Sequence, residues 1–445
     1  MNRSHPPIAV IGAGLAGCEA ALVLARSGFA VTLYEARPEV MTPAHETALP
    51  AELVCSNSLK SNLLPSAHGL LKAELRIGRS PLLAAAAQTS LPAGSALAVN
   101  REAFSREVLR QIEVTPEITF VHCEISEPPP EGWSIIAAGP LASDTLTTWL
   151  QQTFSTESLH FYDAIAPIID AESLDRSIVF SASRWEEGKG DYLNCPFTEE
   201  EYRTFYEALL EADQVSARDF EESRFFESCL PVEVAAGRGF KALAFGPLRP
   251  VGLTDPRTGR WPFAVCQLRK EQASGESYNL VGFQTRLKIP EQQRVFRLIP
   301  GLARAEFLRY GSIHRNTYLD APRLLGNDLS FRTHPHLLLA GQLCGNEGYT
   351  ESIATGHLAA RSLIRRIQGG SWVPPPVESA LGALLRHVTA SEEKVFTPTN
   401  INFGLFPPLE HSGTKRKMGK KEKQERLCSR AIERITPWFA ALEHL

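Results

Sequence analysis

A closely spaced glycine triplet near the N-terminus constrains the fold more than any other feature of the chain. Gly12, Gly14 and Gly17 follow a short apolar strand and open a run of helix-forming residues. The first glycine permits a tight turn, the second lets a pyrophosphate approach the backbone, and the third lets the helix pack closely on the strand. A second strand is predicted over residues 30–34, and Glu35 ends it where a carboxylate can accept hydrogen bonds from a ribose. This spacing predicts a dinucleotide-binding βαβ unit whose helix directs its positive end at the phosphates.

A second signature near the C-terminus favours a flavin over a nicotinamide dinucleotide. An apolar strand ending in glycine, residues 337–341, precedes a glycine-rich turn and a helix predicted over residues 350–367. In large two-part FAD-binding folds, such a strand contacts the ribitol chain and such a helix directs its N-terminus at the flavin ring. Many FAD proteins have an acid where this chain has Gln342, but an amide can still bind a hydroxyl. The residues expected to bind the cofactor are Gly12, Ala13, Gly14, Leu15, Ala16, Gly17, Glu35, Gly341, Gln342, Gly348, Tyr349, Glu351 and Ser352.

The order of predicted elements indicates an α/β protein with an insertion. Aromatic and charged residues become more frequent from about residue 184, and the nucleotide-binding pattern returns after residue 287. We expect a Rossmann-like, glutathione-reductase-like FAD-binding domain with an inserted α+β domain and a C-terminal helical region. The expected boundaries are 1–183 for the first part of the FAD-binding domain, 184–287 for the inserted substrate or RNA domain, 288–370 for the second part and 371–445 for the basic helical region.

Composition narrows the class of protein. No apolar run in the 445 residues approaches the roughly 20 needed to cross a bilayer, and the N-terminus has no apolar signal segment, so we expect a cytoplasmic protein that does not span a membrane. The eight cysteines are scattered with no Cys-x-x-Cys pair, which argues against a metal site or a disulfide framework.

One segment of this acidic chain is strongly basic. Residues 415–426 carry seven basic and two acidic side chains. Such a run is typical either of a solvated helix face or of a surface that binds phosphates. We expect Lys415, Arg416 and Lys417 to bind nucleic acid.

Unusual sequence strings are spread over nearly the whole chain. They are residues 52–62 (ELVCSNSLKSN), 190–196 (GDYLNCP), 226–233 (FESCLPVE), 245–253 (FGPLRPVGL), 278–285 (YNLVGFQT), 309–317 (RYGSIHRNT), 340–349 (AGQLCGNEGY) and 401–407 (INFGLFP). Together they resemble the folate- and FAD-dependent tRNA (uracil-5-)-methyltransferases, the TrmFO family. The related GidA-type enzymes share the opening and the 341–349 segment, but they have a long C-terminal extension that binds a partner GTPase. This chain ends without it, so we expect no obligate protein partner.

The resemblance implies a tRNA methylation that does not use S-adenosylmethionine. The one-carbon unit of 5,10-methylenetetrahydrofolate would be placed on C5 of uridine 54 in the T-loop, making ribothymidine. FADH2 would supply the electrons, and NADH or NADPH would regenerate it. The implied partner is the T-arm of tRNA, whose stacked uridine must be exposed by base extrusion or local unfolding.

Cys55 and Cys229 match the functional cysteines of that family. A thiolate that adds to uracil C6 makes C5 nucleophilic, and a second group must remove the C5 proton. We expect Cys229 to attack the base and Cys55 to act near the flavin, although the opposite assignment stays open. Cys55 precedes an expected helix start at residues 56–59, where the helix dipole would lower the pKa of the thiol.

The folate should stack on the flavin, with hydrogen bonds to its pterin and cations around its glutamate tail. As a set, the residues expected to bind it are Arg184, Lys189, Asp191, Tyr192, Arg286, His314, Arg315 and Asn316.

Other functions remain open on the sequence. A flavin oxidoreductase acting on a small molecule would work without RNA, and the basic run weighs against it. A flavin-stabilised RNA-binding module without catalysis would not need the paired cysteines. A GidA-like modification of wobble uridine is disfavoured by the missing extension.

Overall fold

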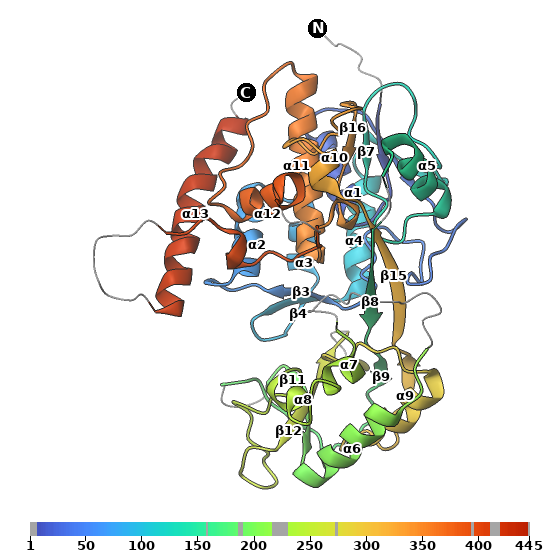
Figure 1. The fold of residues 1–445 in the computed structure, drawn as a ribbon, viewed down its shortest axis with the longest axis vertical. Coiled ribbons are helices and arrows are strands. Elements are labelled where there is room, and N and C mark those ends of the chain that lie inside the picture. The colour runs from blue at the N-terminus through green and yellow to red at the C-terminus, as the bar shows by residue number, and fades with distance from the viewer. Residues whose placement is uncertain are drawn as a thin grey trace.

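The chain folds into an upper and a lower lobe that an antiparallel ribbon connects (Figure 1). The ribbon consists of β8 (Leu159–Ile165) and β15 (Ser312–Tyr318). The computed structural model describes residues 7–156, 159–185, 190–215, 230–271, 275–392, 396–409 and 419–443. In these ranges, no helix combines the length and the apolar character that crossing a bilayer requires.

The upper lobe is built on a parallel sheet with the strand order β16-β7-β1-β2-β6. These strands are β1 (Ile8–Ile11), β2 (Val31–Glu35), β6 (Ile118–His122), β7 (Ser134–Ile136) and β16 (Leu337–Leu339). Strand β1 is buried along its whole length, as expected of a central parallel strand. The last strand, β16, pairs with β7, so the late segment of the chain completes the sheet that the N-terminus begins. The α/β prediction with a parallel nucleotide-binding sheet is confirmed.

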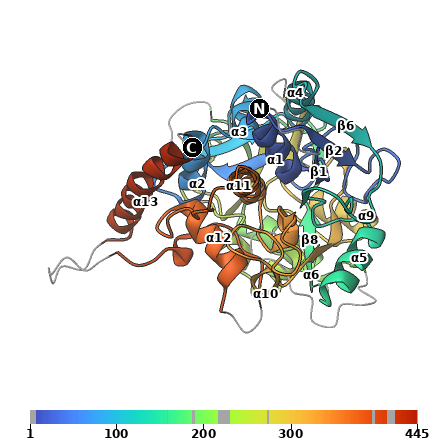
Figure 2. The same cartoon turned by 90° about the horizontal axis from the view of Figure 1, so that it is seen from above.

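Helices and a small antiparallel sheet surround this parallel sheet. The helices are α1 (Leu15–Arg26), α2 (Ala67–Ile77), α3 (Pro81–Gln88), α4 (Arg101–Glu113), α5 (Asp144–Phe154), α10 (Ala321–Leu324), α11 (Tyr349–Ile367), α12 (Ala380–Ala390) and α13 (Lys420–Glu443), with 3-10 turns η2 (Gln342–Cys344) and η3 (Phe403–Leu405). The small sheet contains β3 (Ser58–Ser61), β4 (Ser90–Leu91) and β5 (Ala96–Val99). Helix α13 packs on α2 at the outer edge of the lobe (Figure 2).

The segment after Cys55 differs from its prediction. Residues 56–59 do not begin a helix, because Ser58 pairs with Ala98 of β5 and the chain continues as β3. The next helix, α2, begins only at Ala67, where the hydroxyl of Ser66 accepts a hydrogen bond from the amide of Gly69. The expected helix dipole therefore does not act on Cys55.

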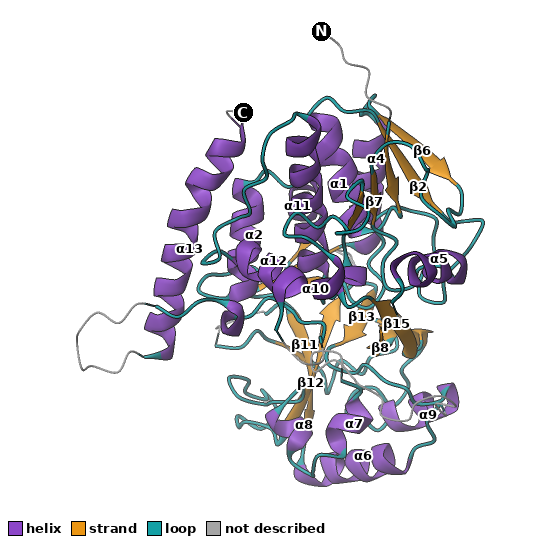
Figure 3. Ribbon diagram, turned by 45° about the horizontal axis from the view of Figure 1, so that its top comes forward, coloured by secondary structure: helices purple, strands orange, loops and turns teal. Residues whose placement is uncertain are grey.

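The lower lobe is built on an antiparallel sheet with the order β10-β11-β12-β13-β9-β14. Its strands are β9 (Ile168–Asp170), β10 (Phe180–Ser181), β11 (Tyr192–Phe197), β12 (Ala264–Lys270), β13 (Ser277–Leu280) and β14 (Phe307–Arg309). Its helices are α6 (Glu199–Glu211), α7 (Val232–Ala236), α8 (Ala242–Phe245) and α9 (Ile289–Phe296), of which α6 lies at the end farthest from the upper lobe (Figure 3). Strand β9 precedes residue 184 and β14 follows residue 287, so we propose that the inserted unit runs from β9 to β14.

A buried carboxylate joins α2 to α12. Glu74 is fully buried and accepts hydrogen bonds from the first amides of α12, those of Ala380 at 2.7 Å and Leu381 at 2.9 Å. Burial raises the pKa of Glu74 to about 8, although the two amide donors favour the charged form. The folded protein therefore holds a proton here that the unfolded chain releases at lower pH.

This linkage predicts how Glu74→Gln changes stability with pH. The variant keeps one acceptor for the α12 amides and loses the other, at a cost of about 1 kcal/mol. In the wild type, the stabilisation from the protonated Glu74 is complete below the unfolded pKa and is lost as the pH rises toward about 8. The free energy of unfolding of the variant should therefore approach that of the wild type, or exceed it, as the pH rises from about 5 to about 8. Urea unfolding at several pH values measures this difference. A constant difference across this range would contradict the interpretation.

Candidate active site

A glycine-lined groove forms where α1 and α11 begin. Gly12 has a φ of +100°, and a Cβ there would lie 2.6 Å from the carbonyl oxygen of Ala137. A Cβ on Gly17 would lie 1.8 Å from the carbonyl oxygen of Gly12, and one on Gly356 would lie 2.2 Å from that of Ala16. The turn, the first helix and the late helix can approach this closely only because these positions have no side chain. The groove is lined by Gly12, Gly14, Leu15, Ala16, Glu35, Gly341, Gln342, Tyr349 and Ser352, among others.

The groove has the features that a dinucleotide requires. The residues before α1 and α11 are Gly14 and Gly348, and within the described residues no side chain caps either helix. The first amides of both helices are therefore available to an anion. A Cβ on Gly14 would meet no atom within 4 Å, so the space beside this helix start is open. The groove residues thus fit the phosphates of FAD.

Glu35 lines this groove at the end of β2. Its carboxylate accepts hydrogen bonds from the amide of Ala13 at 3.0 Å and from Arg37 Nε at 2.8 Å. Burial opposes ionisation, but the Arg37 guanidinium and the backbone amides outweigh it and lower the pKa of Glu35. The residue is therefore an anion at neutral pH, as acceptance of hydrogen bonds from ribose hydroxyls requires.

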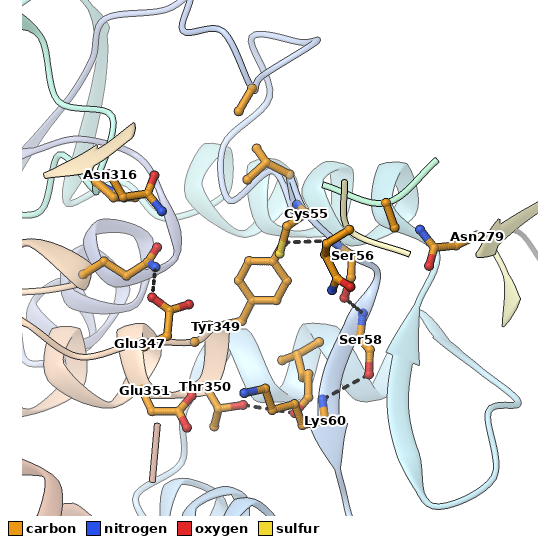
Figure 4. A pocket seen from close by; sticks show the side chains of 18 of the residues that line it. Cys55, Ser56, Ser58, Lys60, Asn279, Asn316, Glu347, Tyr349, Thr350 and Glu351 are labelled. Carbon is orange, nitrogen blue, oxygen red and sulfur yellow. Dashed lines mark hydrogen bonds between the residues drawn. The ribbon is translucent and has the colours of Figure 1, made fainter. Parts of the chain in front are cut away.

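A second cleft continues from the groove into the space between the lobes. The two share Val54, Pro140, Leu141, Gln342 and Tyr349. The upper lobe contributes Cys55, Ser56, Lys60, Glu347 and Glu351, and the lower lobe contributes Arg269, Asn279 and Gln284 (Figure 4). We call this space the interlobe cleft. A group bound at the end of the groove would therefore face it.

Tyr349 holds Cys55 at the junction of groove and cleft. The hydroxyl of Tyr349 accepts hydrogen bonds from the amides of Cys55 at 2.8 Å and Ser56 at 3.2 Å. Its oxygen lies 3.0 Å from Cys55 Sγ. Because the amides occupy both acceptor positions of the hydroxyl, its proton is directed at the sulfur. Burial and the neighbouring Cys55 raise the pKa of Tyr349 well above its usual value, so this proton is retained.

Two arginines add positive charge around the same sulfur. A charge on Cys55 would interact with the guanidinium groups of Arg101 and Arg269. Arg101 Nε is 2.8 Å from the carboxylate of Glu271, whereas Arg269 donates to Asn57 Oδ1 at 2.7 Å. A hydroxyl and two guanidinium groups therefore surround the sulfur, in place of the helix dipole expected from the sequence.

The structure brings only part of the expected substrate-binding set into the cleft. Asn316 lines it. The Arg184 guanidinium donates instead to the carbonyls of Arg249 and Val251, and Arg286 lies beside Glu233. His314 and Arg315 belong to β15, and their side chains are outside what is described, as are Lys189, Cys229, Lys415, Arg416 and Lys417 altogether.

Asp191 and Tyr192 join the lobes rather than line the cleft. The carboxylate of Asp191 accepts from the amide of Gly94 at 2.7 Å, and the hydroxyl of Tyr192 donates to the carbonyl of Ala93 at 3.0 Å. Both contacts connect the start of β11 to the upper lobe.

Other cleft residues were not singled out from the sequence. Lys60 Nζ donates to Asn400 Oδ1 at 2.6 Å and faces the cleft, as do Asn279, Gln284 and Glu347. Each lies within one of the unusual strings, but the strings do not indicate which of their residues face a ligand.

The fold and groove define a two-part dinucleotide-binding α/β protein. The family described as "Glucose inhibited division protein A" matches residues 7–371. The chain is 50% identical to "Methylenetetrahydrofolate--tRNA-(uracil-5-)-methyltransferase TrmFO" of Syntrophus aciditrophicus over 97% of each chain. It is 52% identical to the protein of that name from Geobacter sulfurreducens, over 98% of this chain and 99% of the relative. The chain therefore belongs to the TrmFO group of the GidA family, and the resemblance stated above is confirmed.

A solved structure agrees on the fold. GidA of Aquifex aeolicus superposes with a TM-score of 0.70 at 16% identity, over 100% of this chain and 75% of that one. At this identity the match supports the fold alone.

A matched pair of glycine variants tests the groove. Gly14→Ala adds a methyl group where the protein leaves space, so we expect a melting temperature near that of the wild type but FAD binding weakened by about tenfold or more. Gly17→Ala places its methyl group against the carbonyl of Gly12 and should destabilise the fold itself. Thermal melting of the apoprotein and titration with FAD separate the two effects. Unchanged FAD affinity in Gly14→Ala would contradict the assignment of the groove.

Tyr349→Phe tests the hydrogen bond to Cys55. The variant removes one oxygen and leaves the ring, so we expect the Cys55 thiol to react with iodoacetamide only at higher pH than in the wild type, by about one pH unit. The rate against pH is measured at Cys55 by mass spectrometry of the labelled peptide. Tyr310→Phe, which leaves the groove and cleft intact, is the control. An unchanged pH profile would show that the hydroxyl does not stabilise the thiolate.

Proposed function

We propose that this protein transfers the one-carbon unit of 5,10-methylenetetrahydrofolate to C5 of uridine 54 in the T-loop of tRNA. The observation that carries the proposal is the position of Cys55, which lies in the interlobe cleft where the dinucleotide groove ends. Relatives about half identical over nearly their full length carry the name of this activity. Such a reaction requires a thiol beside a bound dinucleotide, and this site combines a dinucleotide groove with Cys55.

Uracil needs covalent activation before C5 can react. A thiolate adds to C6, the C5–C6 π bond breaks, and its electrons move to the O4 enolate. C5 then forms a bond to the methylene carbon of the folate, whose nitrogen leaves with the bonding electrons. A second group removes the C5 proton while the remaining bond between the methylene carbon and the folate breaks, so that tetrahydrofolate leaves and the carbon becomes an exocyclic methylene on C5. Addition of a hydride equivalent to this methylene, with loss of the thiolate from C6, gives the methyl group and restores the C5–C6 double bond. We propose Cys229 for the attack on C6 and Cys55 for the thiol beside the cofactor.

The described residues of the cleft position the reactants around this chemistry. Tyr349 and the two arginines favour the thiolate of Cys55, while Lys60 offers a cation to the glutamate tail of a folate. Asn279 and Asn316 present amides on opposite sides of the cleft that can bind a pterin or a uracil edge (Figure 4). When bound and reduced, FAD would supply this hydride equivalent, and NADH or NADPH would reduce the flavin again.

A transfer assay tests the proposal. Purified protein with FAD is incubated with tRNA unmodified at the T-loop, methylenetetrahydrofolate labelled in its one-carbon unit, and NADH or NADPH. We expect the label on C5 of uridine 54, and its loss by at least about a hundredfold in Cys55→Ala and Cys229→Ala, because each removes a reacting thiol. Cys428→Ala, which changes a buried thiol in α13, is the control and should retain transfer.

The same assay distinguishes the other functions. Label at a wobble uridine would indicate a GidA-like modification. Oxidation of NADH or NADPH that is indifferent to RNA would indicate a small-molecule oxidoreductase. Binding of tRNA without transfer would indicate a binding module.

A further inference from the structure

Trp185 and Trp261 expose unusually large aromatic surfaces on the lower lobe. Trp185 is 74% exposed and Trp261 is 56% exposed. Their rings contact each other edge to face, with centroids 6.4 Å apart. They come from separate segments of the chain, yet the fold places them side by side. Contiguous apolar surface that remains in water is typical of a binding site.

The protein holds Trp185 in this exposed position at a conformational cost. Its φ is +64°, a region that bulky residues rarely adopt. The Trp185 amide donates to the carbonyl of Gly252 at 3.3 Å, and the indole lies over this glycine, where a Cβ would come within 2.9 Å of the ring. The neighbouring Arg184 donates to the carbonyls of Arg249 at 2.7 Å and Val251 at 2.6 Å. The strand end and the turn at 249–252 are thus tied together, and the indole is presented in a defined orientation.

Two arginines, Arg249 and Arg260, lie in the same segments as the two tryptophans or beside them. Arg260 precedes Trp261, and Arg249 lies close enough to Arg184 to help burial lower the pKa of that guanidinium. Among the described residues, the side chains of Arg249 and Arg260 have no hydrogen-bond or ion-pair partner. The neighbouring carboxylate of Asp255 does not compensate them, because it is already paired with Arg257 at 2.8 Å.

This surface adjoins the interlobe cleft. Pro247, two residues before Arg249, packs against Gly282, where a Cβ would lie 2.6 Å from the proline ring. Gly282 lines the cleft. Arg184 also binds Gln267, which lies two residues from the cleft residue Arg269 on β12, with side chains on the same face of the sheet. A polymer that enters the cleft can therefore continue over the exposed tryptophans.

We propose that Trp185, Trp261, Arg249 and Arg260 form an RNA-binding surface, here called the Trp–Arg surface. Unpaired bases stack on the indoles, and phosphates pair with the guanidinium groups. Stacking on aromatic side chains together with phosphate contacts is the general chemistry by which proteins bind unpaired nucleotides. The inference rests on the proposed function and extends it, because it places the nucleotides that flank the target uridine on the lower lobe.

Variants of the full-length protein, loaded with FAD, test this surface by tRNA binding. We expect Trp185→Ala/Trp261→Ala to raise the Kd for T-loop-unmodified tRNA by about tenfold or more at fixed salt, with an unchanged salt dependence. Arg249→Ala/Arg260→Ala should reduce the slope of log K against log salt by about two, because two phosphate contacts are lost. Trp185→Phe/Trp261→Phe should retain most of the affinity because it keeps aromatic faces. Val373→Ala, an exposed apolar position on the upper lobe, is the matched control and should leave the Kd unchanged.

Several outcomes would overturn the proposal, and they differ from a failure of the proposed function. Equal Kd values for the wild type and both double variants, with FAD content and melting temperature also equal, would exclude the surface while methyl transfer persists. A change of oligomeric state with unchanged tRNA affinity would assign the surface to a second copy of the chain. If the double alanine variants lose FAD or melt early, the Kd of the Trp185→Phe/Trp261→Phe protein is the test. A weaker affinity for tRNA in this variant, with normal folding, would contradict a role of the aromatic faces. A wild type that transfers no label to tRNA would instead refute the proposed function.

Discussion

The close backbone contact between α1 and α11 is the constraint on which the rest of the structure depends. Helix α11 lies against the start of α1 because Gly356 has no side chain to meet the carbonyl of Ala16. Glu19 and His357 form a fully buried pair across this contact, with 2.8 Å between Glu19 Oε1 and His357 Nδ1. Burial lowers the pKa of the histidine. Two helix N-termini from distant parts of the chain therefore open into one groove.

Tyr349 links this groove to the candidate chemistry. It is the first residue of α11, so the packing that directs the helix at the groove also determines where its ring lies. The ring lines both the groove and the interlobe cleft, and its hydroxyl holds the backbone and the sulfur of Cys55. Cofactor binding and the position of the thiol thus depend on the same helix.

The lower lobe contributes through contacts that cross between the lobes. The side chain of Asn57, two residues after Cys55, donates to the carbonyl of Lys270 and accepts from Arg269 on β12. Asp191 and Tyr192 make further contacts with the upper lobe. The sequence predicts a folate pocket at their motif, whereas the contacts that the structure shows for these two side chains are with the other lobe. Residues can belong to a characteristic string because they orient two lobes and not only because they contact a ligand.

The sequence by itself determined the parallel sheet, the groove and the family, because tight turns and close helix contacts require glycine at particular spacings, and these are local properties of the chain. It also indicated Cys55, but the helix that it predicted directly after this residue is wrong. A helix was expected at residues 56–59, but the pairing of Ser58 with Ala98 of β5 makes residues 58–61 the strand β3. Only the tertiary structure decided that Tyr349, Arg101 and Arg269 surround the sulfur, and that Trp185 meets Trp261. These groups come from segments far apart in the chain, and their proximity depends on how helices and sheets pack, which no local pattern encodes.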